Sequence, residues 1–185
     1  MNAARYPDGA ERRAAVELRT VAGRKLVGYA SVFDSPARIG SGFTEIVRRG
    51  AYAATLAKGA DVLCLAEHDP ARLLGRTASG TLKLAEDSRG LHFEVSLPET
   101  TLGADILALA ERGDIGGASV GFRVPPGGDT WPAPDRRELV AVDLLEVSII
   151  SAWPAFNQTV VSARARQLGQ AEASARLRRL LAEVL

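Results

Sequence analysis

A serine between glycines is the first candidate for chemistry in this sequence. Ser119 lies in Gly117–Gly121, which matches the G-x-S-x-G pattern of the nucleophile turn in α/β-hydrolases. That fold places its catalytic histidine after the serine in the chain, whereas both histidines, His68 and His92, precede Ser119. An esterase or other hydrolase of the α/β-hydrolase fold is therefore excluded.

Ser119 keeps its interest because of its local surroundings. If residues 117–124 form a strand, the apolar residues at even positions face the core, and Ser119 shares the other face with Gly117 and Gly121. Such a face leaves room for a substrate, and backbone N–H groups nearby could stabilise an oxyanion. The alternative is that Ser119 is only a small residue in a crowded, glycine-rich strand.

Glu146 is the second candidate, because it lies in the most apolar segment of the chain, residues 139–151. In a regular strand it would share a face with Val142, Leu144 and Ser148. A carboxylate in such surroundings needs a hydrogen-bond or cationic partner. A neutral histidine N–H or a structural arginine would serve equally, and Asp143, on the other face, is a weaker candidate.

His68 is the third candidate, at the end of an apolar strand and before a turn predicted at Asp69-Pro70. A histidine at this place can reach a neighbouring strand, although a solvated side chain is the common alternative. His92 is the weaker histidine, because it lies on the polar face of the alternating strand predicted at 91–97.

No metal or cofactor site is predicted. Cys64 and His68 would lie about 13 Å apart along a strand, and no zinc-ligand spacing occurs. The chain has no glycine-rich phosphate loop of the Walker or Rossmann type. Its single cysteine excludes an intramolecular disulfide and suits a reducing environment.

The charge and hydropathy of the chain narrow its class. The formal net charge of +1 gives no overall field that would attract nucleic acid or an anionic membrane. No apolar run reaches membrane-spanning length, and no signal peptide is evident. We therefore expect an intracellular, soluble protein that binds neither nucleic acid nor a membrane.

The hydrophobic pattern predicts an α+β fold, with a mostly antiparallel β-barrel or strongly curved sheet flanked by helices. Helices are expected within 46–58, at 101–112 and from residue 162 onward, and a proline- and glycine-rich loop at 125–134. The expected organisation is a flexible arm at 1–15, one domain at 16–161 and a helical tail at 162–185.

Several short motifs, in a shared order, resemble the prohead maturation serine proteases of tailed phages and phage-like particles. That family is distantly similar to the herpesvirus assemblins, which use a different third catalytic residue. Six segments are similar to those of the family: the opening strand, a helix start, the histidine segment, an acidic hairpin, the nucleophile strand and a closing motif. They lie at 28–33, 49–52, 67–69, 86–91, 117–122 and 145–156.

The resemblance implies a serine endopeptidase with an assemblin-like fold and a His-Ser-Glu triad. Ser119 would be the nucleophile, His68 the general base and Glu146 the acid that orients the imidazole, so that loss of Glu146 slows turnover without abolishing binding. Ser148 is the fallback nucleophile. Arg123 is too far from Ser119 to stabilise the oxyanion, and backbone N–H groups of residues 116–120 are the expected donors.

The resemblance also implies partners and a location. The substrates would be scaffold, the N-terminal scaffold-like region of the major capsid protein precursor and the protease itself, cleaved inside the procapsid in the host cytoplasm. Self-association is possible in this setting, and the tail at 162–185 would be a scaffold-binding or self-removed segment, or an ordinary surface helix. The alternative function is a non-catalytic capsid scaffold or assembly module on the same fold.

Overall fold

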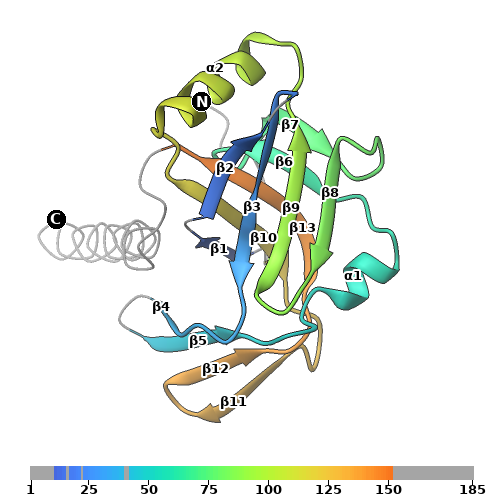
Figure 1. The fold of residues 1–185 in the computed structure, drawn as a ribbon. Helices are drawn as coiled ribbons and strands as arrows, with labels where there is room; N and C mark the ends of the chain where they lie inside the picture. The colour runs from blue at the N-terminus through green and yellow to red at the C-terminus, as the bar shows by residue number, and fades with distance from the viewer. Residues whose placement is uncertain (1–10, 16, 22, 40–41, 152–185) are drawn as a thin grey trace, which may run out of the picture.

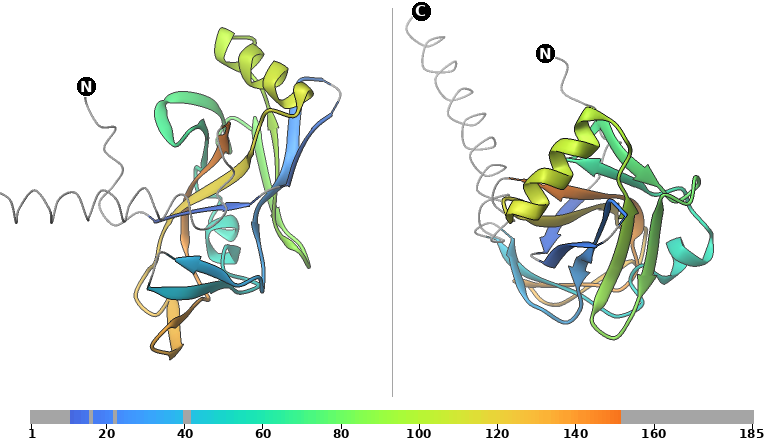
Figure 2. Two further views of the ribbon diagram at one scale, coloured as in Figure 1. Left: turned by 90° about the vertical axis from the view of Figure 1, so that its left-hand side faces the viewer. Right: turned by 45° about the horizontal axis from the view of Figure 1, so that its top comes forward.

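The computed structural model describes residues 11–15, 17–21, 23–39 and 42–151. Its strands form three sheets, two of which pack face to face with the hydrophobic core between them (Figures 1 and 2). The front sheet in Figure 1 has the order β2-β3-β9-β8 and the sheet behind it β1-β10-β13-β6-β7. A smaller sheet, β11-β12-β5-β4, lies at one end of the pair.

The elements follow one another along the chain as three groups. The first comprises β1 (Glu11–Ala15), β2 (Glu17–Val21), β3 (Lys25–Val32), β4 (Ala37–Ile39), β5 (Phe43–Val47) and α1 (Ala53–Ala57). The second comprises β6 (Leu63–Ala66), β7 (Asp69–Arg76), β8 (Leu82–Glu86), β9 (Gly90–Ser96) and α2 (Thr101–Arg112). The third comprises β10 (Gly117–Arg123), β11 (Asp129–Ala133), β12 (Arg136–Leu139) and β13 (Asp143–Ile150).

The predicted α+β class is confirmed, but the barrel, one of the two predicted forms of the sheet, is wrong, since the three sheets do not close into a barrel. The strongly curved sheet, the other form, stays a prediction. Among the described strands most pairs are antiparallel, and the parallel pairs are β13 with β6 and β12 with β5. The assemblin-like form of the fold stays a prediction.

Helix α2 confirms the prediction at 101–112 and has an ordinary physical basis. The Thr100 side chain accepts a hydrogen bond from the Gly103 N–H at 3.2 Å, as an N-cap should. Gly113 ends the helix with a φ of 80°, which glycine adopts at little cost. Ile106, on the inner side of the helix, is fully buried in the core.

Of two other predictions of local structure, the helix is confirmed and the loop is wrong in part. The helix expected within 46–58 is α1 at 53–57, and the β-branched and aromatic residues of 43–47 before it form strand β5. The loop expected at 125–134 contains β11, which tolerates Pro132 because β11 is the edge strand of its sheet.

The flexible arm predicted at 1–15 overlaps a strand of the structure. Residues 11–15, predicted to be part of a flexible arm, form strand β1 and pair with β10 in register from Glu11–Phe122 to Ala15–Ala118. These residues are therefore part of a sheet, and the division of the chain into arm, domain and tail stays a prediction. The tail expected at 162–185 lies outside the described residues.

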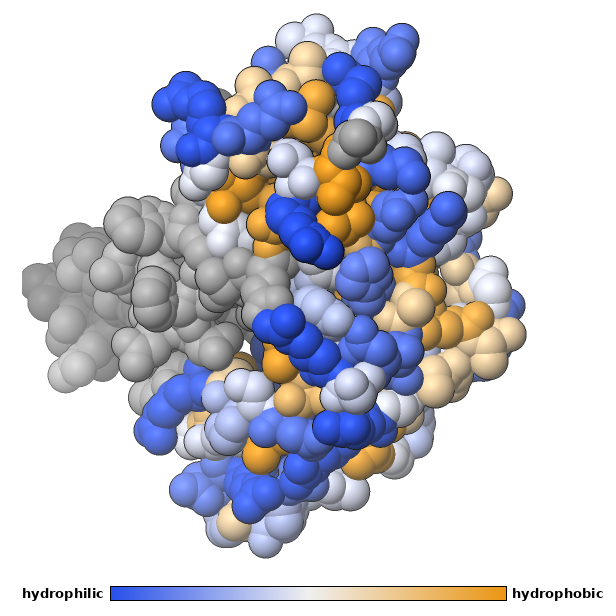
Figure 3. Space-filling model, viewed as in Figure 1, coloured by the Kyte–Doolittle hydropathy of each residue, from blue (hydrophilic) through white to orange (hydrophobic). Residues whose placement is uncertain are grey.

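The outward face of the front sheet is the wet face predicted for residues 91–97. Leu91, Phe93 and Val95 of β9 are fully buried, whereas His92 and Glu94 lie on the partly exposed side. Figure 3 shows that this side of the molecule mixes hydrophilic and hydrophobic residues. The candidate site lies on the other side of the molecule, on the outward face of the β1-β10-β13-β6-β7 sheet.

Candidate active site

Adjacent strands position the three predicted residues. Ser119 lies in β10, Glu146 lies in the neighbouring β13, and His68 directly follows β6, the next strand in the sheet. The sheet order thus gathers segments that are far apart in the sequence. The site is built on neighbouring strands of one sheet and one tight turn.

The predicted alternation of β10 is confirmed. Ala118, Val120 and Phe122 are fully buried in the core between the sheets, so Ser119 and Gly121 lie on the other face. The five-stranded sheet therefore separates the core from the candidate site.

The neighbours of Glu146 on its face were predicted correctly for Ser148 but incorrectly for Leu144, because β13 is not regular. The pairing with β10 shifts between Gly121, opposite Glu146, and Phe122, opposite Leu144, so Leu145 is an extra residue in the ladder. Leu144 consequently faces the core, while Glu146 and Ser148 face outward with Ser119. This bulge turns the carboxylate away from the apolar core.

His68 owes its position to a two-residue turn between β6 and β7. Glu67 and His68 have φ values of 56° and 58°, the positive-φ pattern of the turns that join hairpin strands. The turn was predicted at Asp69-Pro70, but those residues begin β7. The Glu67 carboxylate accepts a hydrogen bond from the Ser151 N–H at 2.5 Å, which links the turn to the end of β13.

The structure brings His68 and Glu146 together. His68 Nδ1 lies 2.6 Å from Glu146 Oε1, with 17% of the histidine side chain and 3% of the glutamate side chain exposed. An ionised carboxylate only accepts hydrogen bonds, so Nδ1 carries the proton in this pair. In a neutral imidazole that leaves Nε2 as the atom able to take up a proton.

The second oxygen of the carboxylate has its own partner. The Ser148 hydroxyl donates to Glu146 Oε2, and both residues are almost completely buried. Beneath them, the Glu146 side chain lies where a Cβ on Gly121 would stand. Sequence analysis missed these two contacts, although the two-residue spacing of Glu146 and Ser148 in a strand already placed them on one face.

Ser119 lies directly opposite Ser148 in the ladder between β10 and β13. Side chains in such a pair have Cβ atoms about 4.5–5.5 Å apart. The Ser119 hydroxyl donates to the Arg13 carbonyl oxygen of β1 at 2.8 Å, and the residue is 2% exposed. In this structure its proton is therefore directed to β1 and not to the imidazole.

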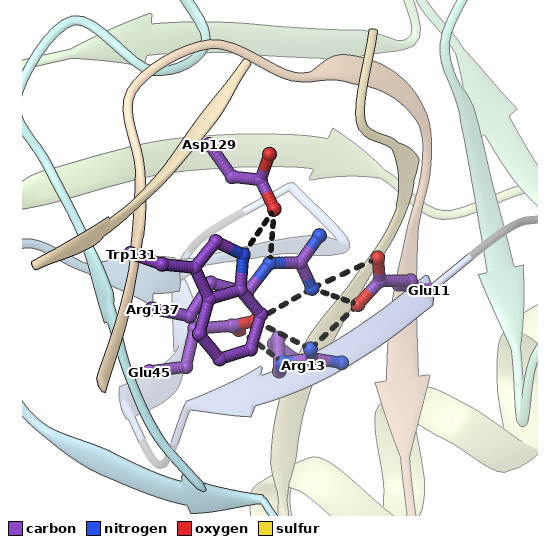
Figure 4. Close-up of polar contacts among 6 residues, drawn as sticks. All are labelled: Glu11, Arg13, Glu45, Asp129, Trp131 and Arg137. Carbon is purple, nitrogen blue, oxygen red and sulfur yellow. Dashed lines mark hydrogen bonds and ion pairs between the residues drawn. The ribbon is translucent and has the colours of Figure 1, made fainter. Parts of the chain in front are cut away.

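A cluster of ion pairs fixes β1 beside Ser119 (Figure 4). Glu45 of β5, 1% exposed, accepts hydrogen bonds from Arg13 of β1 and Arg137 of β12. Arg137 also contacts Glu11 at 2.8 Å and Asp129 at 2.8 Å. Because the cluster joins β1 to β5, β11 and β12 of the smaller sheet, it couples that sheet to the strand that contacts the candidate nucleophile.

The charges of the cluster also shift its acid–base equilibria. Burial alone would raise the pKa of the Glu11 carboxyl, but the hydrogen bonds and positive charges of Arg137 and Arg13 outweigh it and lower the pKa. Burial would likewise lower the pKa of Arg13, yet Glu45 and Glu11 hold it above its ordinary value. Both groups therefore stay charged at neutral pH.

The remaining candidates lie elsewhere. His92 is in the front sheet, edge-on to Tyr29 with ring centroids 5.4 Å apart, and Asp143 is exposed at the start of β13. Cys64 is fully buried in the core, where burial raises the pKa of its thiol. In the described part of the chain no group of three or more histidine, cysteine or carboxylate side chains could hold a metal ion.

The expected oxyanion donors are not supported. The Gly116 N–H donates to the Ile150 carbonyl at 2.9 Å, and β10 is paired along both edges, with β1 and β13. The N–H groups of that strand therefore point to neighbouring strands within the ladder.

Among the described residues no helix is long and apolar enough to cross a membrane.

Comparison with known proteins gives the family. Neither a curated protein nor a solved structure matches the chain at a significant level. The model of the caudovirus prohead serine proteases matches residues 13–174, a span that contains every residue of the site, and the chain belongs to this family.

Proposed function

We propose that this chain is an endopeptidase in which Ser119 is the nucleophile, His68 the general base and Glu146 the acid that orients His68. Membership of the prohead serine protease family makes the chain a serine protease with a role in capsid maturation inside the assembling procapsid. The triad is the more specific claim, and it is supported by the geometry of the site.

The observation that carries the proposal is the 2.6 Å contact between His68 Nδ1 and Glu146 Oε1. A carboxylate at Nδ1 selects the tautomer with Nε2 unprotonated, which a general base requires, and stabilises the imidazolium that forms later. Both residues lie on the outward side of the sheet that carries Ser119. An arginine paired with Glu146 would have left His68 without this role.

In the proposed reaction the Ser119 hydroxyl first rotates away from the Arg13 carbonyl toward His68. Its oxygen attacks the scissile carbonyl carbon while His68 Nε2 takes up the hydroxyl proton. The imidazolium then gives this proton to the leaving amine as the peptide bond breaks, and an acyl-enzyme on Ser119 remains. Water, deprotonated by His68, attacks the acyl-enzyme. The bond between the acyl carbon and Ser119 Oγ breaks, His68 returns the proton to Oγ, and the acid product leaves.

The proposed substrates are scaffold, the N-terminal scaffold-like region of the major capsid protein precursor, and the protease itself. The family places the protease within the assembling procapsid. We further propose that this assembly takes place in the host cytoplasm, that the protease self-associates there, and that no nucleic acid or membrane takes part.

The direct test is co-expression with the cognate capsid protein precursor, followed by intact-mass measurement of both proteins. The wild-type chain is expected to shorten the precursor at a defined site, whereas Ser119→Ala leaves it at full length. Ser31→Ala is a matched control, because Ser31 is also buried but lies in the other large sheet. Cleavage by Ser119→Ala equal to that of the wild type would contradict the assignment.

A non-catalytic assembly module is the second candidate function. It is favoured by one observation, the hydrogen bond from the buried Ser119 hydroxyl to Arg13, which is also what a structural serine would form. In that case the wild-type chain binds the precursor but does not cleave it. Co-purification without any cleavage over the course of assembly would support this function.

A further inference from the structure

We propose that Ser148 is a positioning residue, which acts through Glu146 to hold the carboxylate in the orientation that His68 needs. The inference rests on the proposed triad and adds a fourth side chain to it. It also assigns Ser148 a role different from that of a nucleophile.

The two oxygens of the Glu146 carboxylate have different hydrogen-bond partners. Oε1 lies 2.6 Å from His68 Nδ1, and the Ser148 hydroxyl donates to Oε2, so each oxygen has one hydrogen-bond donor. A hydroxyl has a single proton, and here it is directed to the carboxylate. This hydrogen bond fixes the plane of the carboxylate and prevents rotation about the last side-chain bond of Glu146.

Glu146 and Ser148 are both buried. Glu146 is 2% exposed and Ser148 is fully buried, so water cannot easily replace the hydroxyl as a donor to Oε2. Hydrogen bonds to a charged group are about twice as strong as those between neutral groups, and an unsatisfied buried oxygen is costly. Removing the hydroxyl therefore leaves the carboxylate free to turn toward another donor.

The hydrogen bonds of the two serines bear on the identity of the nucleophile. A serine nucleophile gives its proton to the base, and in this structure neither hydroxyl is bonded to the imidazole: Ser119 donates to a neutral backbone carbonyl, and Ser148 donates to the Glu146 carboxylate. Because a hydrogen bond to a charged group is the stronger of the two, Ser119 is the hydroxyl that turns to His68 more easily. Ser148 also lies opposite Ser119 in the ladder, so both hydroxyls are on the same face. Ser119 remains the residue that attacks the substrate, and Ser148 stays bonded to the carboxylate.

The test is a double-mutant cycle measured with a peptide that spans the cognate cleavage site. Ser148→Ala is expected to lower kcat by about 10- to 100-fold with little change in KM, since only the orientation of the base is affected. In the background of Glu146→Ala, the same substitution is expected to have no further effect. An equal loss in both backgrounds would overturn the proposal, because Ser148 would then act independently of Glu146.

A second pair of variants separates the hydroxyl from the shape of the side chain. Ser148→Thr and Ser148→Val add the same bulk beside Ser119, but only threonine retains a donor. The threonine variant is expected to be at least about 10-fold more active than the valine variant. Equal activity of folded Thr and Val variants would overturn the proposal, whereas activity in Ser119→Ala would overturn the proposed function itself.

Discussion

At the scale of single residues, Glu146 is the side chain on which the proposed chemistry depends most. Glu146→Gln keeps its size and its hydrogen bond with Ser148, but an amide does not stabilise the imidazolium and can present its N–H₂ group to Nδ1. We expect kcat to fall by about 10³-fold or more, as when the acid of a serine protease triad is replaced, with KM nearly unchanged. Steady-state kinetics on a cleavage-site peptide measures both quantities.

A control variant shows whether the loss of kcat is specific to Glu146. Glu138 of β12 is a partly buried glutamate that accepts a hydrogen bond from Arg48 at 2.7 Å and does not contact His68. Glu138→Gln is therefore expected to keep the wild-type kcat. If Glu146→Gln retained full activity under the same conditions, the orienting role of its carboxylate would have to be abandoned.

Gly121 is a second residue at which the site allows no change. A methyl group there would overlap the Glu146 side chain, whose Cδ would lie only 2.9 Å from the new Cβ. Gly121→Ala is expected to displace the carboxylate from His68 and to lower kcat by about 10-fold or more. Kinetics together with a urea unfolding curve distinguishes this local effect from a loss of folded protein.

Gly42→Ala is the matched control for that substitution. A methyl group at Gly42 would be 3.5 Å from the nearest atom, the Ile39 carbonyl oxygen, which is an ordinary contact. We expect no change in kcat for this variant. Full activity of Gly121→Ala would show that the carboxylate tolerates displacement, contrary to the geometry described above.

At the scale of elements, strand β1 connects the candidate nucleophile with the smaller sheet. Arg13 accepts the Ser119 hydrogen bond through its carbonyl and binds Glu45 through its guanidinium. Glu45→Gln removes the charge of a carboxylate that is 1% exposed and leaves Arg13 and Arg137 near one another with less compensation. We expect the free energy of unfolding to fall by about 3 kcal/mol, as measured by urea denaturation.

The ion pair between Lys25 and Glu94 provides the comparison, at 2.9 Å on the exposed face of the front sheet. Since solvent screens such pairs, Glu94→Gln is expected to leave the urea midpoint unchanged. Equal effects of the two substitutions would mean that the buried cluster contributes no more than a surface pair.

The pH dependence of stability follows from Glu11 in the same cluster. Its pKa is lowered below the ordinary value of 4.5 in the folded chain by Arg137 and Arg13. Its carboxylate therefore stabilises the fold fully above pH 4.5, and this contribution is lost as the pH falls through the lowered pKa. Glu11→Gln should accordingly be less stable than the wild type at pH 7, with a smaller difference near pH 3.

Urea midpoints of both proteins at the two pH values measure this difference. A wild-type advantage that grew on acidification would contradict the sign of the shift. The arginine partners stay charged at both pH values, so the comparison reports on the Glu11 carboxyl.

At the scale of the whole molecule, sequence predicted what local chemistry dictates. The glycine–serine alternation of β10 gave the correct face for Ser119, and the capping residues Thr100 and Gly113 agree with the predicted helix at 101–112. The pairing of His68 with Glu146 was implied by resemblance to the family and not by spacing. Its geometry depends on which strands become neighbours, and local patterns of residue type and spacing do not show this.

The features that sequence missed arise from register and backbone conformation. The bulge at Leu145 reverses the face of Glu146, and it depends on how β13 pairs with β10. The turn at Glu67 and His68 uses positive φ values without glycine, so no turn residue marks it. The Arg13 carbonyl, which holds the Ser119 hydroxyl, is a backbone group that any residue would supply.

The most direct measurement of the central claim is the site and rate of modification by a serine-directed fluorophosphonate. The account predicts one adduct, found by peptide mass spectrometry on Ser119, with a labelling rate that falls sharply in His68→Ala and in Glu146→Ala. Ser31→Ala should be labelled at the wild-type rate. An adduct on Ser148 in place of Ser119, or labelling of Ser119 that is independent of His68, would contradict the account.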